Sequence, residues 1–417
     1  MKPPRTILCL CFVLCIQHLV AQEIPEVEPP EFIKSIVFKT LGKPYQFPVL
    51  QQGETMQLEF DDLSSTVSDY YYKISYYNYD WTLSNLFQND FLKGYDNLRL
   101  ENFETSFNTL QPYTHYTLSL PNENIDFLLS GNYSLDIYSA QGQLLLRRRF
   151  VVSDGTANVA AGVFRTRDLN YYQTHQSVQF SVQPIGAPFR NPEGLVKVVV
   201  LQNEQWPSAI TGLVPQYVNG NTLEYRYDET ARFEGGNEYL FFDTKDIRVA
   251  TPNVSYVALN ERYESYLNTD PIRANYPYTY GPDINGDFEI RTFQGTRQAA
   301  IEADYSWVHF SLSAPFEFSS GSLHVLGKFN NYQPSTANQM KFNPALEGYE
   351  VSLLLKQGFY NYRYVVLNED GVAFNALSGT HAQTENRYMV LVYYRPFGAL
   401  HDALIGFGTA SSFEILN

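Results

Sequence analysis

Polar and apolar residues alternate with a period of two along most of the chain. The alternation is clearest in residues 73–77 (KISYY), 133–138 (YSLDIY) and 178–182 (VQFSV). Successive side chains of a strand point to opposite faces, so this pattern predicts β-strands with one buried face. Residues 195–202 (LVKVVVLQ) and 351–355 (VSLLL) are more continuously apolar, which is typical of strands in the core of a sandwich.

Turn-forming residues separate these predicted strands at short intervals. They occur at residues 141–142 (QG), 219–221 (NGN), 283–287 (DINGD) and 369–371 (EDG). Gly and Asn tolerate positive φ, and Asn and Asp side chains hydrogen-bond nearby backbone, so these segments favour turns. The sequence shows no long amphipathic pattern of helical period. We therefore expect an all-β protein of tandem immunoglobulin-like sandwiches, each of about 100 residues.

Shifts in composition divide the chain into three such units behind a leader. A polar stretch rich in Pro, Tyr, Asn and Gly separates the last two units. The predicted division is a signal peptide at 1–22, an N-terminal sandwich at 23–154, a second sandwich at 155–266, a linker or long loop at 267–300, and a C-terminal E-set-like sandwich with a terminal strand at 301–417.

The leader has the features of a secretory signal peptide. Lys2 and Arg5 precede an apolar run at residues 7–16, and Ala21 provides a small residue before the expected cleavage site. The run is too short to span a bilayer, and no later stretch is long enough. All three cysteines lie inside the leader, so the mature chain has no thiol for a disulfide. An exported chain without disulfides favours a bacterial periplasm.

Charge and aromatic content narrow the classes of partner. The formal charge is −15, and it becomes −17 once Lys2 and Arg5 are removed. Binding to nucleic acid or to anionic lipid normally requires a basic patch, so both are disfavoured. The chain contains 33 Tyr and 29 Phe. These residues favour strands, and Tyr also recurs at hydrated protein interfaces.

Sequence patterns of catalytic and metal sites are absent. The six histidines outside the leader have no metal-ligand spacing, and G-x-S-x-G, S-x-x-K and P-loop patterns do not occur. Asp61 and Asp62 are adjacent in a predicted strand and so point to opposite faces, whereas Glu302 and Asp304 share a face but lack a cleft partner. Residues 283–287 depart from the calcium-loop pattern and are interpreted as a hairpin turn. We expect no enzyme activity, no metal and no cofactor.

Two segments of the third unit resemble a carbohydrate-binding module. Residues 326–332 (LGKFNNY) and 356–364 (KQGFYNYRY) are similar to the G-x-F-N-x-W and G-x-Y-x-Y-K segments of the glycogen-binding, immunoglobulin-like module. Tyr332 stands where that module usually has Trp. The same residues also suit turns within a sandwich, so an E-set-like fold and a periplasmic or surface glycan-binding protein both remain open.

A larger set of segments, taken in order, resembles one family over residues 32–406, the plug proteins of the type IX secretion system. The segments are residues 79–86 (YDWTLSNL), 89–95 (NDFLKGY), 112–116 (PYTHY), 130–133 (SGNY), 202–206 (QNEQW), 235–239 (GGNEY), 242–243 (FD), 302–310 (EADYSWVHF), 353–358 (LLLKQG), 384–388 (TENRY) and 391–395 (LVYYR). The specificity comes from their number and order, since no single motif is decisive.

This resemblance implies a non-enzymatic periplasmic subunit, peripheral to the outer membrane. Such a subunit caps the periplasmic opening of a very large outer-membrane β-barrel translocon and blocks the pore when it is idle. A releasable contact of this kind suits aromatic anchors with a polar rim. The candidate anchors are Tyr276, Tyr278 and Tyr280, and the Tyr-rich residues 69–79 are a second candidate segment.

Overall fold

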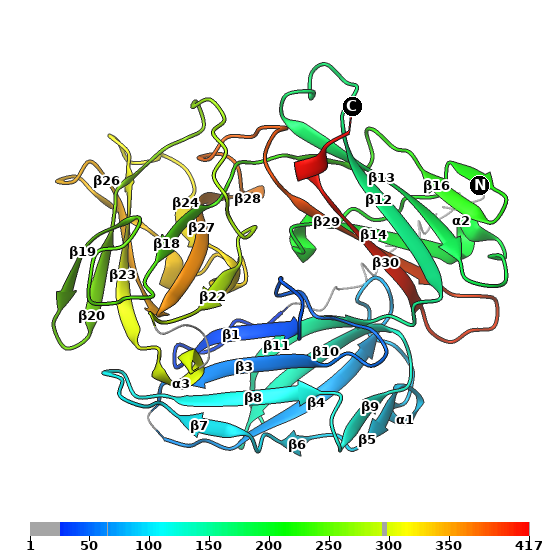
Figure 1. Cartoon of the computed structure of the whole chain (residues 1–417), viewed down its shortest axis with the longest axis horizontal. Coiled ribbons are helices and arrows are strands. Elements are labelled where there is room, and N and C mark those ends of the chain that lie inside the picture. Colours follow the sequence, from blue (N-terminus) through cyan, green and yellow to red (C-terminus); the bar gives the residue numbers. More distant parts are fainter. Residues whose placement is uncertain (1–25, 65, 294–297, 417) are drawn as a thin grey trace, which may run out of the picture.

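Three β-sandwiches lie around a common centre, with the first at the bottom of Figure 1, the second at the upper right and the third at the upper left. The computed structural model describes residues 26–64, 66–293 and 298–416. The predicted all-β class of tandem sandwiches is confirmed. The predicted signal peptide at 1–22 lies outside the described residues.

The first sandwich packs the sheet β1-β3-β8-β7 against the sheet β2-β11-β10-β4-β6, and β5 pairs with β9 beside them. One core cluster, which includes Phe60, Tyr76, Tyr133 and Phe150, fills the space between the sheets. The elements are β1 (Ile33–Thr40), β2 (Val49–Leu50), β3 (Met56–Asp62), β4 (Tyr70–Tyr77), α1 (Gln88–Phe91), β5 (Leu92–Gly94), β6 (Leu98–Arg99), β7 (Phe103–Thr105), β8 (Thr114–Leu120), β9 (Ile125–Phe127), β10 (Gly131–Ser139) and β11 (Leu144–Val152).

The second sandwich packs the sheet β12-β13-β16-β15, with β17 also on β13, against the sheet β14-β29-β30. Its elements are β12 (Ala157–Arg165), β13 (His175–Pro184), α2 (Pro192–Leu195), β14 (Val196–Gln202), β15 (Tyr217–Asn219), β16 (Thr222–Tyr225), β17 (Arg232–Glu234), β29 (Arg387–Tyr394) and β30 (Ala403–Ser411), with 3-10 turns at Trp206–Ser208 and Ser412–Glu414.

The third sandwich packs the sheet β19-β20-β23-β26-β25 against strands that pair with β27. The stretch 267–300, predicted as a linker or long loop, is mostly irregular but contributes β21 and β22 to these sheets. The elements are β18 (Leu240–Asp243), β19 (Val254–Leu259), β20 (Tyr263–Leu267), β21 (Asp270–Pro271), β22 (Phe288–Ile290), α3 (Ala299–Glu302), β23 (Tyr305–Ser313), β24 (Ser322–Leu326), β25 (Lys341–Asn343), β26 (Gly348–Lys356), β27 (Gly358–Asn368) and β28 (Gly371–Ala373), with 3-10 turns at Lys328–Asn330 and Thr336–Asn338.

The last two strands of the chain pair differently from the predicted division, in which residues 301–417 form one unit. β29 pairs with β14 along its whole length, and β30 pairs with β29. The chain therefore leaves the second sandwich after β17, builds the third sandwich, and returns to complete the second. Alternation within each strand carries no information about which sheet the strand joins, and this explains why the sequence pattern did not reveal the return.

Strands β14 and β29 are buried on both faces. Val198 and Val390 point into the core of the second sandwich. Val199 and Leu391, the next residues along each strand, point the other way and pack against rings of the first sandwich. Double burial removes the need for a polar face, which is the physical reason for the continuous apolar run at 195–202.

Leu391→Ala is expected to lower the free energy of unfolding by about 2–5 kcal/mol, because it opens a cavity at a fully buried position between two sandwiches. Urea unfolding followed by circular dichroism measures the change. The control is Leu169→Ala at a side chain that is 88% exposed, where a change within about 0.5 kcal/mol is expected. Equal effects of the two substitutions would contradict the double burial of β29.

Candidate functional site at the junction of the three sandwiches

The three tyrosines predicted to contact a partner lie in irregular chain between β21 and β22. Tyr276 and Tyr280 are 54% and 55% exposed. Tyr278 is half-buried, and its hydroxyl donates a 2.5 Å hydrogen bond to the carboxylate of Glu238. Two of the three rings are therefore accessible to a partner, while the third holds this loop against the segment that enters β18. Their role in binding stays a prediction.

Tyr332, at the sugar-stacking position of the carbohydrate-binding resemblance, is only 7% exposed. Its hydroxyl lies 3.4 Å from the Asn285 main-chain oxygen, to which it donates. Gly286 has φ +85°, and a Cβ there would lie 2.5 Å from the Tyr332 hydroxyl, so only glycine permits this close packing. Residues 326–332 therefore form part of an internal contact, and the Tyr332 ring presents no open face to a sugar.

A serine, a histidine and a glutamate lie in a row on one face of the sheet formed by β20, β23 and β26. Ser352 Oγ is 2.7 Å from His309 Nδ1, and His309 Nε2 is 3.3 Å from a Glu264 carboxylate oxygen. Nucleophilic catalysis also requires donors aimed at a developing oxyanion. Here the neighbouring main chain is committed to the β-ladder, and the Tyr266 ring stacks on His309 at 4.1 Å. The row is a cross-strand ladder of side-chain contacts on β20, β23 and β26.

Within residues 26–64, 66–293 and 298–416, no group of three or more His, Asp and Glu side chains is arranged to hold a metal ion. The helices of this part of the chain are all too short or too polar to cross a membrane.

The residues that bind the three sandwiches to one another meet at a common junction. A loop of the first sandwich, residues 44–48, enters it between two prolines. The buried Phe47 ring packs at 5.4 Å from the Trp206 ring of the second sandwich. Gln46 reaches the third sandwich, where its main-chain N–H donates to Asp287 at 2.9 Å and its side-chain amide donates to a main-chain oxygen of β22 at 2.7 Å. One loop thus binds both other sandwiches.

Two of the three tryptophans meet at this junction around an arginine. Trp81 and Trp206 pack edge to face at 4.8 Å, and the Arg149 guanidinium lies 4.7 Å from the Trp81 ring centre. Trp81 has φ 63°, a costly conformation for a bulky side chain, so the surrounding contacts must hold it there. The cation–π geometry and the ring packing join the first sandwich to the second.

A buried ion pair joins the first sandwich to the third. Lys356 Nζ, from β26, donates to Asp61 of β3 at 2.6 Å, and both side chains are almost fully inaccessible. His115 and Tyr305 also bond the Asp61 carboxylate, at 2.7 and 2.6 Å. Burial alone would raise the pKa of Asp61, but the charges and hydrogen bonds of Lys356 and His115 outweigh it and lower the pKa. The neighbouring Asp62 accepts instead from Tyr70 inside the first sandwich, on the opposite face of β3.

The turn predicted at residues 283–287 lies at the contact between the second and third sandwiches. Asp283 accepts from the Asn285 main-chain N–H at 2.7 Å and from the Tyr239 main-chain N–H at 2.5 Å. Burial, helped by the nearby carboxylates of Glu238 and Glu385, raises the pKa of Asp283 to about 6 against the opposing effect of the two hydrogen bonds.

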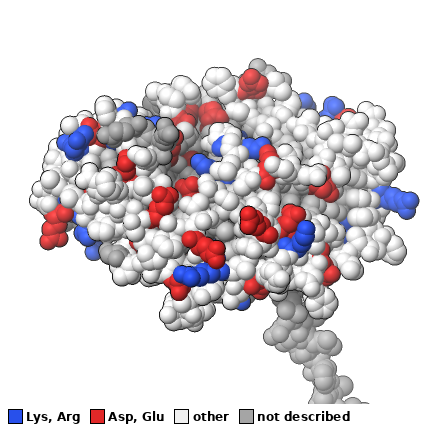
Figure 2. Space-filling view, turned by 60° about the horizontal axis from the view of Figure 1, so that its bottom comes forward, with Lys and Arg blue, Asp and Glu red and all other residues white. Residues whose placement is uncertain are grey.

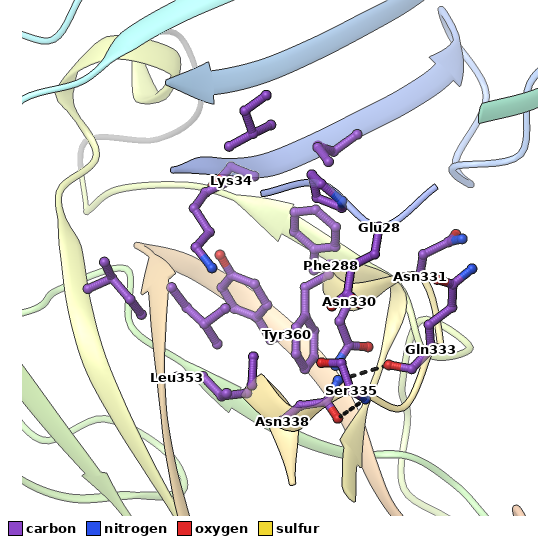
Figure 3. A pocket seen from close by; sticks show the side chains of 18 of the residues that line it. Glu28, Lys34, Phe288, Asn330, Asn331, Gln333, Ser335, Asn338, Leu353 and Tyr360 are labelled. Carbon is purple, nitrogen blue, oxygen red and sulfur yellow. Dashed lines mark hydrogen bonds between the residues drawn. The ribbon is translucent and has the colours of Figure 1, made fainter. Parts of the chain in front are cut away.

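Two cavities open at the junction. The central cavity, about 340 Å³, is bounded by all three sandwiches and includes Arg148, Glu204, Trp206 and Lys328 in its lining. The side cavity, about 110 Å³, lies between the first and third sandwiches. Its lining combines the Tyr360 ring and Leu353 with polar side chains that include Glu28, Lys34 and Asn338 (Figure 3).

The interface residues were not identified from the sequence, because their partners are distant along the chain. Lys356 and Asp61 are 295 residues apart. One available signal was a lysine at the end of an apolar run, Leu353-Leu354-Leu355-Lys356, and another was the proline-flanked aromatic loop at 44–48. A buried lysine requires a carboxylate partner, but periodicity does not indicate which one.

The chain is similar to a known protein family and to a solved structure over most of its length. A family model described as the first domain of the type 9 secretion system plug protein matches residues 33–154. No curated protein matches the chain. A solved structure titled as a hypothetical protein from Parabacteroides merdae superimposes with a TM-score of 0.88 at 30% identity, and covers 94% of this chain and 100% of its own.

Two further solved structures resemble the chain only weakly. One is titled as the BSP domain of a biofilm-associated protein, with a TM-score of 0.19 and 6% identity over 94% of this chain and 61% of its own. The other is a trypsin-activated alpha-2-macroglobulin from Escherichia coli, with a TM-score of 0.14 and 9% identity over 93% and 35%. Scores this low carry no argument about fold or function.

Lys356→Met is expected to lower the free energy of unfolding by about 3–5 kcal/mol, because it leaves the Asp61 charge buried without its cation. Adding Asp61→Asn should restore part of the loss, since the unpaired charge is then removed. Urea unfolding at pH 7 measures both variants. Lys341→Met at an exposed lysine is the control, with an expected change within about 0.5 kcal/mol. An additive double variant would contradict a direct interaction between the two charges.

Asp283 should make the fold relatively more stable at pH 5 than at pH 7. Its pKa in the folded state, about 6, lies above the ordinary value. The folded chain therefore holds this proton more tightly, and stability falls as the pH rises through 6. Relative to Asp283→Asn, the wild type should gain about 1 kcal/mol between pH 7 and pH 5. Urea unfolding measures both proteins at both pH values. The same difference in free energy of unfolding between them at pH 5 and at pH 7 would contradict the assignment.

Proposed function

The chain belongs to the type 9 secretion system plug protein family, and from this premise we propose that it caps the periplasmic opening of that system's large outer-membrane β-barrel. In this role it is a non-enzymatic subunit, exported by its leader and peripheral to the outer membrane. It blocks the pore while the translocon is idle and needs neither cofactor nor metal.

The observation that carries this proposal is the bonding of three sandwiches into one body. An obstruction must keep its shape against whatever presses on it from either side. Separate sandwiches on flexible linkers would not, because few contacts would resist their relative motion. Here an apolar cluster joins the first sandwich to the second, and the Asp61–Lys356 pair joins it to the third. The chain crosses between the second and third sandwiches twice, which also restricts their separation.

The surface is compatible with a contact that can release. Acidic and basic side chains are interspersed with neutral residues on the face shown in Figure 2, without a large patch of one sign. We propose that Tyr276 and Tyr280 supply exposed aromatic anchors for the barrel, with surrounding polar residues as the rim. Tyr278 completes the predicted set and acts indirectly, by holding the loop through Glu238.

Copurification from detergent-solubilised outer membranes at native expression tests the proposal. The expected result is recovery of one very large β-barrel protein in near-equal amount. Recovery of the chain alone, together with retention on an oligosaccharide column, would overturn the proposal in favour of the glycan-binding alternative. Neither the capping role nor the glycan-binding alternative requires an enzyme substrate.

Replacing Tyr276 and Tyr280 with Ala together should reduce recovery of the barrel by about tenfold or more, since two aromatic anchors of this kind are each worth over 1 kcal/mol. Tyr278 is left in place so that the loop keeps its hydrogen bond to Glu238. Tyr217→Ala, at a ring 60% exposed on the second sandwich, is the matched control and should leave recovery unchanged. Equal recovery with both variants would remove this loop from the contact.

A further inference from the structure

A short extended segment at the start of the described chain crosses the junction. We call residues 26–30 (EVEPP) the strap. Val27 forms a bridge of antiparallel type with Arg147 of β11. The Glu26 carboxylate accepts from the Arg149 main-chain N–H at 2.9 Å and from the side-chain amide of Asn331 in the third sandwich. The strap thus pairs with one sandwich and contacts another.

The strap has the chemistry of a bound peptide. Its two prolines favour an extended backbone, so little ordering is needed to hold it against a strand edge. Glu26 and Glu28 are two residues apart and so point to the same side of an extended chain. Every residue of the strap is only partly buried or exposed. Segments held by so few buried contacts open at low free-energy cost.

Cations gather where the strap crosses. Arg148 donates to the Val27 main-chain oxygen at 3.2 Å and otherwise to its neighbour's carbonyl. In the described part of the chain, Lys328 and Lys34 form no ion pair within 4.0 Å. Burial lowers the pKa of all three groups, and the carboxylates of Glu26 and Glu28 are among the charges that oppose this effect. Glu204, which also lines the central cavity, and Asp287 act on Lys328 in the same direction as Glu26.

The strap also borders both cavities of the junction. Glu26 lines the central cavity, and Glu28 lines the side cavity (Figure 3). The residues common to both linings are Ile36, Arg148, Phe329, Asn331 and Gln333. The space under the strap is therefore a groove with cations and aromatic rings along it, and the strap covers it.

We propose that this groove is a binding site for an acidic, extended segment of a partner polypeptide, and that the strap occupies it in the absence of that partner. The partner's strand replaces Val27 at the edge of β11 and its carboxylates replace those of Glu26 and Glu28. This is strand addition to a sheet edge, in which main-chain bonds supply affinity and side-chain contacts supply specificity. The inference does not depend on the proposed capping of a barrel.

The test uses fluorescence polarisation of a labelled peptide with the sequence of residues 26–31, Glu-Val-Glu-Pro-Pro-Glu, which is the strap and the residue that follows it. The protein is the mature chain shortened to begin at Glu31, with its fold checked by circular dichroism. Saturable binding that weakens with salt is expected. A peptide with both strap glutamates changed to Gln should bind about tenfold more weakly, and so should Lys328→Met protein. The unshortened chain should bind about tenfold more weakly as well, because its own strap competes at high effective concentration.

A second variant covers the case in which the shortened chain does not fold. The double substitution Glu26→Gln/Glu28→Gln in the full mature chain weakens the binding of the strap to the groove. The substituted chain should therefore bind the labelled peptide more tightly than the wild type does. A peptide Asp-Ile-Asp-Pro-Pro-Glu should bind too, because the site selects charge and extension. Equal binding of the acidic and amide peptides, or no binding to a folded strapless protein, would overturn the proposal. Dissociation of a dimer of this chain by the peptide would also overturn the proposal. The groove would then bind the strap of a second copy of the chain and not a different partner.

Discussion

The burial of β14 and β29 on both faces is the constraint on which the rest of the molecule depends. One face of each strand closes the core of the second sandwich, and the other face provides the apolar floor on which the first sandwich packs. A polar substitution on either face would therefore leave an unpaired group inside a core. Because the same two strands serve two interfaces, neither sandwich can shift without disturbing the other, and the third is held by the two chain crossings that flank it.

The first sandwich meets its neighbours by two kinds of interaction. Contact with the second is mainly apolar and aromatic, which gives strength but little direction. Contact with the third includes the Asp61–Lys356 pair with His115 and Tyr305, whose hydrogen bonds fix the approach of β3 and β26. A buried pair of this kind often adds little net stability over apolar residues of similar size. Its contribution here is to orientation, since a rotated third sandwich would leave two charges unpaired.

The sequence allowed the fold class to be predicted, because alternation at 73–77, 133–138 and 178–182 is a local property of each strand. Asp61 and Asp62 point to opposite faces for the same reason. The return of β29 and β30 to the second sandwich was not predicted, since strand pairing depends on residues nearly 200 positions apart, such as Leu201 and Met389. The buried role of Tyr332 was also missed, because a turn motif is the same whether its aromatic ring packs inward or faces solvent.

The discontinuity of the second sandwich sets an order of assembly for the folding chain. The strands of the first sandwich are contiguous in the chain and can pair before the later strands are available. β14 cannot pair until β29 is available, and the chain between them has to fold or remain soluble in the meantime. Closing so long a loop is slow. A chain that stops before β29 therefore leaves exposed the apolar faces of β14 that would otherwise be covered. The complete shape therefore requires the chain through β30, and a shortened chain would expose apolar strands to proteases.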